Sequence, residues 1–343
     1  MATRHGDTLL FEHPPVIAAH AAVGGKKEGE GPLAAEFDEL FPDNGCGQAN
    51  WEAAEKILQL RAIRLCLKNA HATEKQVSLV LAGDLQAQCT ASSYAMRELH
   101  LPFAGLFGAC STMAEALGLG AALCSAGLAD GLLAVTSSHF CAAERQFRTP
   151  LSYGAVRTPT AQWTATAAGC CLLHPAGPGV GVAAVTFGRV EDQQVRDINN
   201  MGAAMAPAAA ATLLRYFRDT GQAPGDFDAI YTGDLGHLGS RLFRELLTAE
   251  GLVMKNHIDC GCILYDAAHQ TVKSGGSGPG CCAAVLCGHI LPRLERGSYR
   301  RVLFLATGAL MSQTTFLQKE SIPAIAHLVE LRGPGCNGKG ENA

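Results

Sequence analysis

A cysteine stands between a short apolar run and a predicted helix in LFGACSTMAEALGLG, residues 106–120. A thiol at the first turn of a helix faces unpaired backbone N–H groups and the positive end of the helix dipole, and both favour the thiolate. This position suits covalent catalysis, in which a thiolate attacks a carbonyl carbon. Cys110 is therefore the candidate nucleophile, and the alternative interpretation is that its side chain only lines a pocket.

A group of polar and aromatic residues follows the predicted strand LLAVTSS, residues 132–138. Parallel α/β sheets form binding sites at the carboxyl ends of their strands, and an Arg guanidinium binds a carboxylate through two parallel hydrogen bonds. The segment thus predicts a pocket for a carboxylate ligand. The alternatives are a solvated surface pair for Glu144 and Arg145 and a core position for His139. The candidate ligand-binding residues in this segment are His139, Arg145, Arg148, Tyr153, Arg157, Gln162 and Trp163.

Two aspartates and a His/Cys cluster are candidate metal ligands. Asp84 and Asp234 each follow a glycine at the end of a predicted strand, where they cap a loop or helix or bind calcium. Calcium takes about six to eight oxygen ligands, so two isolated carboxylates make a poor site. HIDCGC brings His257, Cys260 and Cys262 together, but the chain has no CxxC pair to complete a zinc site. We expect neither a metal site nor a cofactor.

The elements that must position these residues alternate between strand and helix twice along the chain. Such alternation indicates a parallel sheet with crossover helices in each of two α/β halves. LAGDL recurs as YTGDL, and the predicted strand LLAVTSS recurs in character as the predicted strand VLFLATGA, so we infer an internal duplication. We assign residues 1–195 to the first half, 196–332 to the second and 333–343 to a flexible tail.

Two stretches of the chain carry further expectations. TAQWTATAAGCCLLH and GVAAVTFGRVED are predicted to be strands that close the first half. MGAAMAPAAAATLLRYF is predicted to be a tightly packed helix with Pro207 in its first turn, where a missing N–H costs nothing.

The composition excludes several classes of protein. The 343 residues are 48% hydrophobic and 17% charged, which suits a large globular core. A formal net charge of −4 and the lack of Lys/Arg blocks argue against nucleic-acid binding. No segment reaches the ~20 apolar residues of a membrane span, and His5, Asp7 and Glu12 interrupt the region of a signal peptide. Fourteen cysteines without a secretion signal predict reduced thiols in a soluble, intracellular protein.

The doubled α/β pattern, with GACS at the start of a long small-residue helix, resembles the thiolase-like superfamily of thiolases and ketoacyl synthases. Within it, the chain from about Thr8 to Arg332 resembles the stage V sporulation protein AD family of spore-forming bacteria. The segments that carry this resemblance are LAGDLQ, LFGACSTMAEA, TSSHFCAAERQFRTP, TAQWTATAAG, MGAAMAPAAA, YTGDLGHLGS, GGSGPGC, ATGALMS and QKESIPAIAH.

The resemblance implies a thiolase-like fold of two duplicated α/β halves, with mixed sheets packed in layers around central helices. It implies a protein that binds dipicolinic acid, pyridine-2,6-dicarboxylate, as the free acid or as its calcium complex, for uptake into the developing spore. It also implies a homodimer that lies peripherally at the inner spore membrane through other components of the uptake complex. The ligand then lies in the former active-site pocket, lined by Cys110, His139, Arg145, Arg148, Tyr153, Arg157, Gln162, Asp234, His237 and Ser274.

The chain departs from the enzymes of this superfamily at the helpers of the nucleophile. Where ketoacyl synthase III enzymes open an HQAN-like motif with the catalytic His, the chain has Asp234, and the nearest imidazole is that of His237. The turn VKSGGSGPG, which contains Ser274, lacks the enzymes' Asn. A positioned acid or base contributes ~10²- to 10⁴-fold to a rate, so Cys110 is interpreted as a nucleophile without helpers. The alternatives are an acyltransferase of the ketoacyl synthase III or thiolase type, and a structural partner of the membrane complex that holds no ligand.

Overall fold

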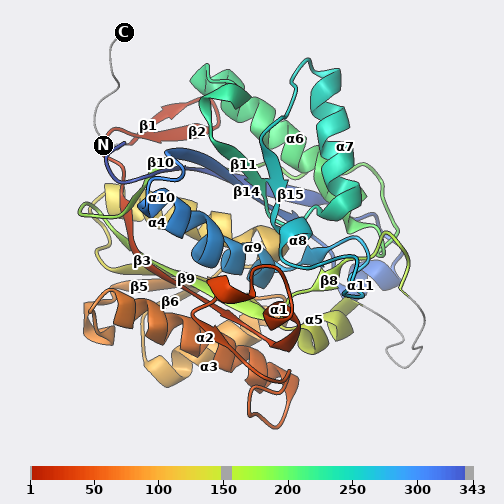
Figure 1. The fold of residues 1–343 in the computed structure, drawn as a ribbon, viewed down its shortest axis with the longest axis horizontal. Coiled ribbons are helices and arrows are strands. Elements are labelled where there is room, and N and C mark those ends of the chain that lie inside the picture. Colours follow the sequence, from red (N-terminus) through yellow and green to blue (C-terminus); the bar gives the residue numbers. More distant parts are fainter. Residues whose placement is uncertain (1, 148–156, 337–343) are drawn as a thin grey trace.

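The structure of the protein is a computed structural model, and it describes residues 2–147 and 157–336 (Figure 1). The predicted ligand-binding residues Arg148 and Tyr153 lie outside the described residues, as do residues 337–343 of the expected tail.

Two half-sheets with the same strand order confirm the inferred duplication. The first runs β6-β5-β7-β9-β3 and the second runs β12-β11-β14-β15-β10. In each, the three strands at the outer end are parallel and the fourth is antiparallel to both of its neighbours, so the sheets are mixed as expected. The strands of the first half-sheet are β3 (Val16–Gly24), β5 (Leu79–Gly83), β6 (Phe103–Gly105), β7 (Leu132–Ser138) and β9 (Ala167–His174). Those of the second are β10 (Val180–Thr186), β11 (Ala229–Thr232), β12 (His257–Asp259), β14 (Arg301–Ala309) and β15 (Ala324–Arg332).

Strand β10 belongs to the second half-sheet, although the sequence analysis expected it to close the first. It pairs with β15 from Gly181 to Thr186, whereas its pairing with β3 involves only Val180 and Gly181. Its apolar run suits either sheet, and only the pairing partner decides between them. The boundary at residue 195 remains a prediction.

Helices form three layers around the two half-sheets (Figure 1). α2 (Trp51–Asn69) and α3 (Thr90–Leu99) cover the outer face of the first half-sheet, and α6 (Met201–Thr220) and α7 (Gly236–Ala249) cover that of the second. Between the half-sheets lie α4 (Thr112–Ser125), α9 (Pro279–Val285) and, after a π-helical turn, α10 (Leu291–Glu295).

The central helix α4 consists of small residues because it packs against both half-sheets. A Cβ atom on Gly118 would lie 2.7 Å from Val185 of β10, and one on Gly120 would lie 2.7 Å from Leu132 of β7. Side chains at these positions would push the layers apart. The glycines of the ALGLG stretch thus fix the spacing of the core around Cys110.

The prediction that Pro207 lies in the first turn of its helix is wrong. Helix α6 begins at Met201, so Pro207 stands in its interior and removes one hydrogen bond from the helix. Helix-forming residues precede the proline, and buried alanines pack the helix against the second half-sheet. This packing offsets the local cost of the proline.

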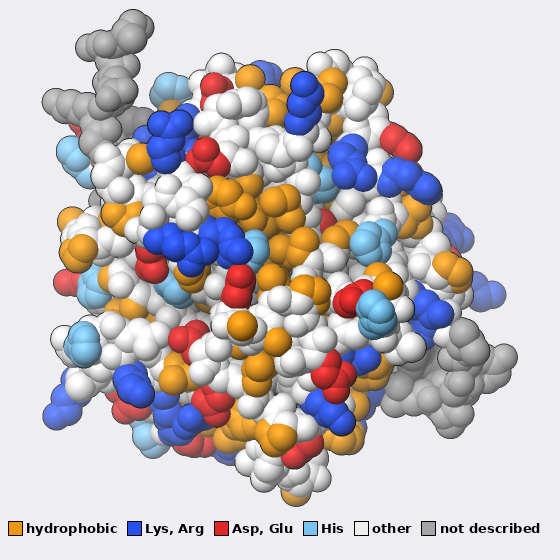
Figure 2. Space-filling model, in the orientation of Figure 1, with side chains coloured by type: hydrophobic (Ala, Val, Ile, Leu, Met, Phe, Trp, Pro, Cys, Tyr) orange, Lys and Arg blue, Asp and Glu red, His pale blue; other side chains and the backbone are white. Residues whose placement is uncertain are grey.

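The remaining elements are short. They are β1 (Ala2–His5), β2 (Thr8–Phe11), β4 (Glu39–Leu40), β8 (Trp163–Thr164), β13 (Gly276–Ser277), α1 (Lys26–Gly29), α5 (Phe140–Phe147), α8 (Cys260–Ile263) and α11 (Gln313–Leu317). Across the described ranges, no helix combines the length with the hydropathy that a membrane crossing requires. On the face shown in Figure 2, acidic and basic side chains are interspersed, and no extended surface of one sign is visible there.

Candidate functional site

Cys110 lies on a 3₁₀ turn, Ala109–Ser111, directly before α4. The preceding Ala109 has a φ of 52°, a left-handed conformation that costs a non-glycine residue about 1 kcal/mol or more. The turn is held because Ser111 Oγ donates to the carbonyl of Gly108 at 2.7 Å. The predicted placement of Cys110 at a helix start is confirmed, and its side chain is buried.

Asp234 follows β11 and accepts hydrogen bonds from three donors in two distant segments. Thr307 Oγ1 of β14 donates to Oδ1 at 2.6 Å. Ser277 Oγ and the backbone N–H of Gly278 donate to Oδ2 at 2.9 and 3.1 Å. The carboxylate is fully buried, and these bonds satisfy it within the protein.

Ser277 links Asp234 to the thiol. It reaches the site because β13 pairs in parallel with β8, which places Ser277 opposite Thr164. The Cys110 Sγ atom lies 3.8 Å from Ser277 Oγ. Since the single hydroxyl proton of Ser277 goes to Asp234, the thiol is the donor in its contact with Ser277.

This arrangement keeps the Cys110 thiol protonated. Burial and the neighbouring Asp234 carboxylate raise the pKa of Cys110 well above its usual value. A reactive cysteine needs the opposite, a pKa lowered by a cation, an imidazolium or a metal. Among the described residues, no imidazole hydrogen-bonds to Cys110.

His237 and Ser274, the residues nearest the positions where the enzymes carry catalytic His and Asn, contact each other's segments. His237 is exposed on the first turn of α7, and its backbone N–H donates to the carbonyl of Ser274 at 2.7 Å. The Ser274 side chain is buried and accepts from the backbone N–H of Leu238 at 3.4 Å. These two residues therefore hold each other's loops together.

His139, at the end of β7, has a structural set of contacts. Its Nε2 donates to the carbonyl of Asn44 at 2.7 Å, and its Nδ1 accepts from the backbone N–H of Ala142 at 3.4 Å. The ring stacks on Trp51 with centroids 5.5 Å apart. Burial lowers its pKa, so the imidazole is neutral, with both nitrogens occupied.

The described arginines of the predicted pocket are ion-paired. Arg145 pairs with Glu52 of α2. Arg157 pairs with the buried Glu144 at 2.8 Å, and its guanidinium lies 5.2 Å from the centroid of the Trp163 ring. Arg157 also donates to the carbonyl of Gln162. The structure thus brings Arg157, but not Arg145, to the segment that carries Gln162.

Gln162 connects this segment to the site. Its Nε2 donates to the carbonyl of Asp234 and, at 3.1 Å, to that of Gly276. Its Oε1 is buried and has no partner among the described residues. A cavity of about 20 Å³ lies here, lined by Ala161, Gln162, Thr164, Ile198, Asn199, Met201 and Ser277. It has room for a water molecule and is far below the about 300 to 1,000 Å³ of typical ligand pockets.

The residues considered as metal ligands form hydrogen bonds within the protein. Asp84 accepts from the backbone N–H groups of Gln86 and Ser92, as a loop-capping residue does. His257 Nε2 contacts Thr232 Oγ1 at 2.8 Å. Within the described ranges, no group of three or more His, Cys, Asp or Glu side chains is arranged to hold a metal ion.

Two side-chain donors to Asp234, Ser277 and Thr307, build the site and were not predicted from the sequence. Ser277 stands in the GGSGPG stretch, and Thr307 stands in ATGA at the end of the predicted strand. A signal existed, because ATGA occupies the place in the second half that LLAVTSS occupies in the first. The hydroxyl residues in LLAVTSS and ATGA were therefore candidates for hydrogen bonds to Asp84 and Asp234, respectively.

A family model and a curated relative both place the chain in the same protein family. The model of the stage V sporulation protein AD family matches residues 5–332. The chain is 40% identical over 329 residues to stage V sporulation protein AD of Bacillus subtilis (strain 168), which covers 96% of this chain and 97% of the relative.

Solved structures support the thiolase-like fold. 3-Oxoacyl-[acyl-carrier-protein] synthase III from Aquifex aeolicus VF5 aligns with a TM-score of 0.56 at 10% identity, covering 93% of this chain and 99% of that one. Cerulenin-bound OleA from Xanthomonas campestris aligns with a TM-score of 0.61 at 13% identity, covering 96% and 99%. At these identities the likeness concerns the fold alone, and it confirms the predicted fold class.

Proposed function

The chain belongs to the stage V sporulation protein AD family, and from this membership we propose that it is a non-catalytic sporulation protein that binds dipicolinic acid for uptake into the developing spore. The binding site is the former nucleophile pocket, with Cys110 as part of its wall. Because the cavity beside Gln162 and Ser277 holds only about 20 Å³, this proposal requires the segments that line it to move apart when the ligand enters.

The observation that carries the non-catalytic part is the Cys110–Ser277–Asp234 chain of contacts. A condensing enzyme needs a thiolate and a donor to the thioester oxygen. Here a carboxylate takes the place of an imidazole, and burial of the thiol together with this carboxylate raises the pKa of Cys110. Asp234 acts as a positioning residue, because its oxygens are already bonded to Ser277, Gly278 and Thr307.

Positive charge and aromatic surface beside Ser277 support the choice of a flat dicarboxylate. Trp163 stacks on Phe140 with centroids 3.7 Å apart, and the Lys27 ammonium lies 4.3 Å from the centroid of the Trp163 ring. Arg157 lies on the same pair of rings. A pyridine ring with two carboxylates needs such cations and an apolar slot. The predicted contacts of Arg148 and Tyr153 belong to this proposal.

Isothermal titration calorimetry with dipicolinate tests the proposal against pyridine-3,5-dicarboxylate, an isomer of equal charge and size. We expect only dipicolinate to bind. Titrations with and without calcium distinguish binding of the free acid from binding of the calcium chelate. Cys110→Ser should retain this binding, since no thiolate is used. Equal heats for the two isomers contradict the proposal.

The arginine variant Arg148→Ala should weaken dipicolinate binding by roughly 10- to 100-fold, the effect of a lost charge-assisted hydrogen bond. Arg241→Ala, an exposed substitution on α7, is the matched control and should leave the affinity unchanged. Unchanged affinity in Arg148→Ala removes that residue from the site.

An acyltransferase remains the second candidate because Cys110 still stands at a helix start, as a nucleophile would. Incubation with acyl-CoA followed by intact-mass measurement tests it. An adduct that is absent in Cys110→Ala supports acyl transfer, whereas no adduct under forcing conditions contradicts it.

A homodimer is part of the proposal, with the exposed edge of β6 as its interface. Ala104 and Gly105 of this edge strand are exposed, and the nearby side chains of Phe107 and Tyr94 are 59% and 48% exposed. Light scattering should show a dimer that Phe107→Asp converts to a monomer. Leu128→Asp, at another exposed site, should leave the dimer intact. A monomeric unmodified protein contradicts this interface.

We further propose that the protein lies peripherally at the inner spore membrane through other components of the uptake complex. Co-purification of the protein with spore membranes tests this. If it docks purely as a structural partner that holds no ligand, membrane recovery will be normal while dipicolinate produces no heat.

A further inference from the structure

A cavity of about 300 Å³ lies far from Cys110, beside the β1–β2 hairpin, and is lined by Arg4, Asp7, Leu9, Phe187 and Arg189. This volume is at the lower end of the about 300 to 1,000 Å³ of small-molecule sites. It shares no lining residue with the Cys110 site.

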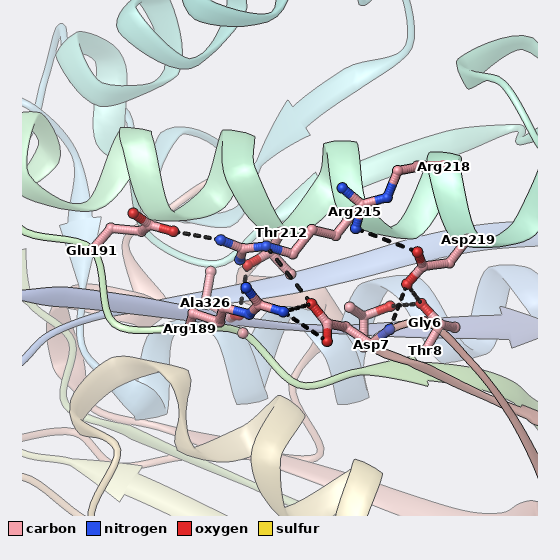
Figure 3. Close-up of polar contacts among 12 residues, drawn as sticks. Gly6, Asp7, Thr8, Arg189, Glu191, Thr212, Arg215, Arg218, Asp219 and Ala326 are labelled. Carbon is pink, nitrogen blue, oxygen red and sulfur yellow. Dashed lines mark hydrogen bonds and ion pairs between the residues drawn. The ribbon is translucent and has the colours of Figure 1, made fainter.

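The polar side of the cavity is held rigidly by the network in Figure 3. Arg189 Nη2 donates to both oxygens of Asp7, at 3.0 and 2.7 Å. The backbone N–H of Asp7 in turn donates to Asp219 of α6 at 2.8 Å, and the Thr8 hydroxyl donates to the same Asp219 oxygen at 3.1 Å. The hairpin and α6 therefore hold Asp7, and the Asp7 carboxylate orients the guanidinium of Arg189, whose side chain is 64% exposed.

Arg215 of α6 adds a further positive charge beside Asp7. Its Nε lies 3.9 Å from Asp7, and its Nη2 pairs with Glu191 at 2.5 Å (Figure 3). Its Nη1 is buried without a partner among the described residues. Arg189 chiefly, with Arg215 and Arg4, lowers the pKa of Asp7, so this carboxylate stays ionised.

The lining of the cavity has an excess of one positive charge. Arg4 and Arg189 supply two cations and Asp7 one anion. The Arg4 Nε atom donates to the carbonyl of Gly6 at 2.9 Å, and no carboxylate pairs with its guanidinium in the part of the chain that the structure describes. A single negative charge on a ligand balances this excess.

Two of the five residues that line the cavity, Leu9 and Phe187, are apolar. The Phe187 ring is supported by His327, with centroids 5.8 Å apart in an edge-to-face arrangement. An aromatic ring on a ligand can pack against Phe187 while its charged group reaches the guanidinium groups.

We propose that this cavity binds a small aromatic monocarboxylate, with the carboxylate on Arg4 and Arg189 and the ring on Leu9 and Phe187. This site is independent of the dipicolinate proposal, because no residue of the Cys110 site takes part.

Saturation-transfer NMR titrations with benzoate and its neutral analogue benzamide test the site. Benzoate should bind at least ~10-fold more tightly than benzamide, and Arg4→Gln should weaken benzoate by a similar factor, because each change removes a charge-assisted hydrogen bond. Arg218→Gln is the matched control, since Arg218 belongs to the same network but lies outside the cavity lining. It should leave benzoate affinity unchanged.

Equal affinities for benzoate and benzamide overturn the proposal, as do equal affinities of the unmodified protein and Arg4→Gln. Arg4 lies on an exposed strand, so its substitution should leave the fold intact. Thermal unfolding of each variant verifies this before the titration. Phe187→Leu provides a second, uncharged variant, which should weaken benzoate through loss of the aromatic contact.

Discussion

The two Gly-Asp strand ends of this duplicated fold have the same sequence pattern and different tasks. Asp84 follows β5 and Asp234 follows β11, the equivalent strands of the two half-sheets. Each carboxylate is fully buried and accepts three hydrogen bonds from the protein. Each also has a neighbouring cysteine, Cys89 in the first half and Cys110 in the second.

The difference lies in where the donors come from. All donors to Asp84 belong to Gln86 and Ser92, within eight residues along the chain. The donors to Asp234 are 43 to 73 residues away and bring β13, α9 and β14 together beside Cys110. The first aspartate therefore completes a local turn, whereas the second assembles a site. A duplicated motif keeps its backbone position, but its role depends on what the tertiary structure places around it.

Each aspartate also has a buried carboxyl neighbour, Glu55 of α2 beside Asp84 and Asp259 of β12 beside Asp234. Ser137 Oγ donates to Glu55 at 2.9 Å, and Gln86 Nε2 donates to it at 2.6 Å. Burial and the nearby Asp84 raise the pKa of Glu55 to about 8. One carboxyl of the pair is therefore neutral around pH 7, which makes the first-half network a pH-sensitive structural element.

The largest expected effect comes from replacing the two aspartates. Asp84→Ala and Asp234→Ala should each lower the free energy of unfolding by about 3 to 5 kcal/mol, because three buried donors lose their acceptor. Only Asp234→Ala should also abolish dipicolinate binding, since it releases Ser277 and Gly278. Urea unfolding and calorimetry at low temperature measure the two effects.

The matched pair Asp84→Asn and Asp234→Asn keeps the side-chain volume if the alanine variants do not fold. Loss of dipicolinate binding in both variants to the same extent would falsify the contrast between a local turn and an assembled site.

A smaller effect should appear in the pH dependence of stability. Because burial and Asp84 raise the pKa of Glu55 in the folded state to about 8, well above the ordinary value of a glutamate, the native state binds a proton that the unfolded chain releases. Stability contributed by this group is complete below the unfolded pKa and is lost as pH rises towards about 8. The unmodified protein should therefore lose free energy of unfolding between pH 5 and pH 8, whereas Glu55→Gln should not. The difference in this free energy, variant minus unmodified protein, should rise by on the order of 2 to 3 kcal/mol over that range.

Urea unfolding at the two pH values measures this gain. Glu98→Gln is the control, since Glu98 is exposed and its pKa is lowered by Lys56 and Arg64, so its dependence has the opposite sign and stays under ~1 kcal/mol. A pH profile of Glu55→Gln parallel to that of the unmodified protein contradicts the assigned pKa.

The smallest expected effect concerns the two cysteines. Burial and Asp84 raise the pKa of Cys89 to about 11, and burial and Asp234 raise that of Cys110. Both thiols should react slowly with iodoacetamide at neutral pH, and Asp84→Asn and Asp234→Asn should each accelerate alkylation of the adjacent thiol, by less than ~10-fold.

Peptide mass spectrometry after timed alkylation follows each site separately. A Cys110 that reacts faster than a free thiol in the unmodified protein would show an activated nucleophile and favour the acyltransferase. Acceleration of the distant thiol rather than the adjacent one would point to general unfolding instead of local charge.

Much of the fold followed from the sequence because strand and helix periodicity is local. The segments around β5, α4, β7, β11 and β14 were predicted in the correct order and type, and the repeated Gly-Asp motif indicated the duplication. Pro207 was misplaced because the packing of buried alanines on the second half-sheet, which offsets the lost hydrogen bond, cannot be seen in the local sequence. Strand β10 was assigned to the wrong half because an apolar strand does not encode its pairing partner.

The sequence by itself determined the duplicated α/β architecture and the position of Cys110 at a helix start. Only the tertiary structure decided that Asp234, Ser277 and Thr307 meet beside the thiol and that His139 serves the Asn44 loop. The physical reason is range: helix starts and strand ends are fixed by neighbouring residues, whereas the hydrogen bonds that define this site join residues 43 to 167 positions apart.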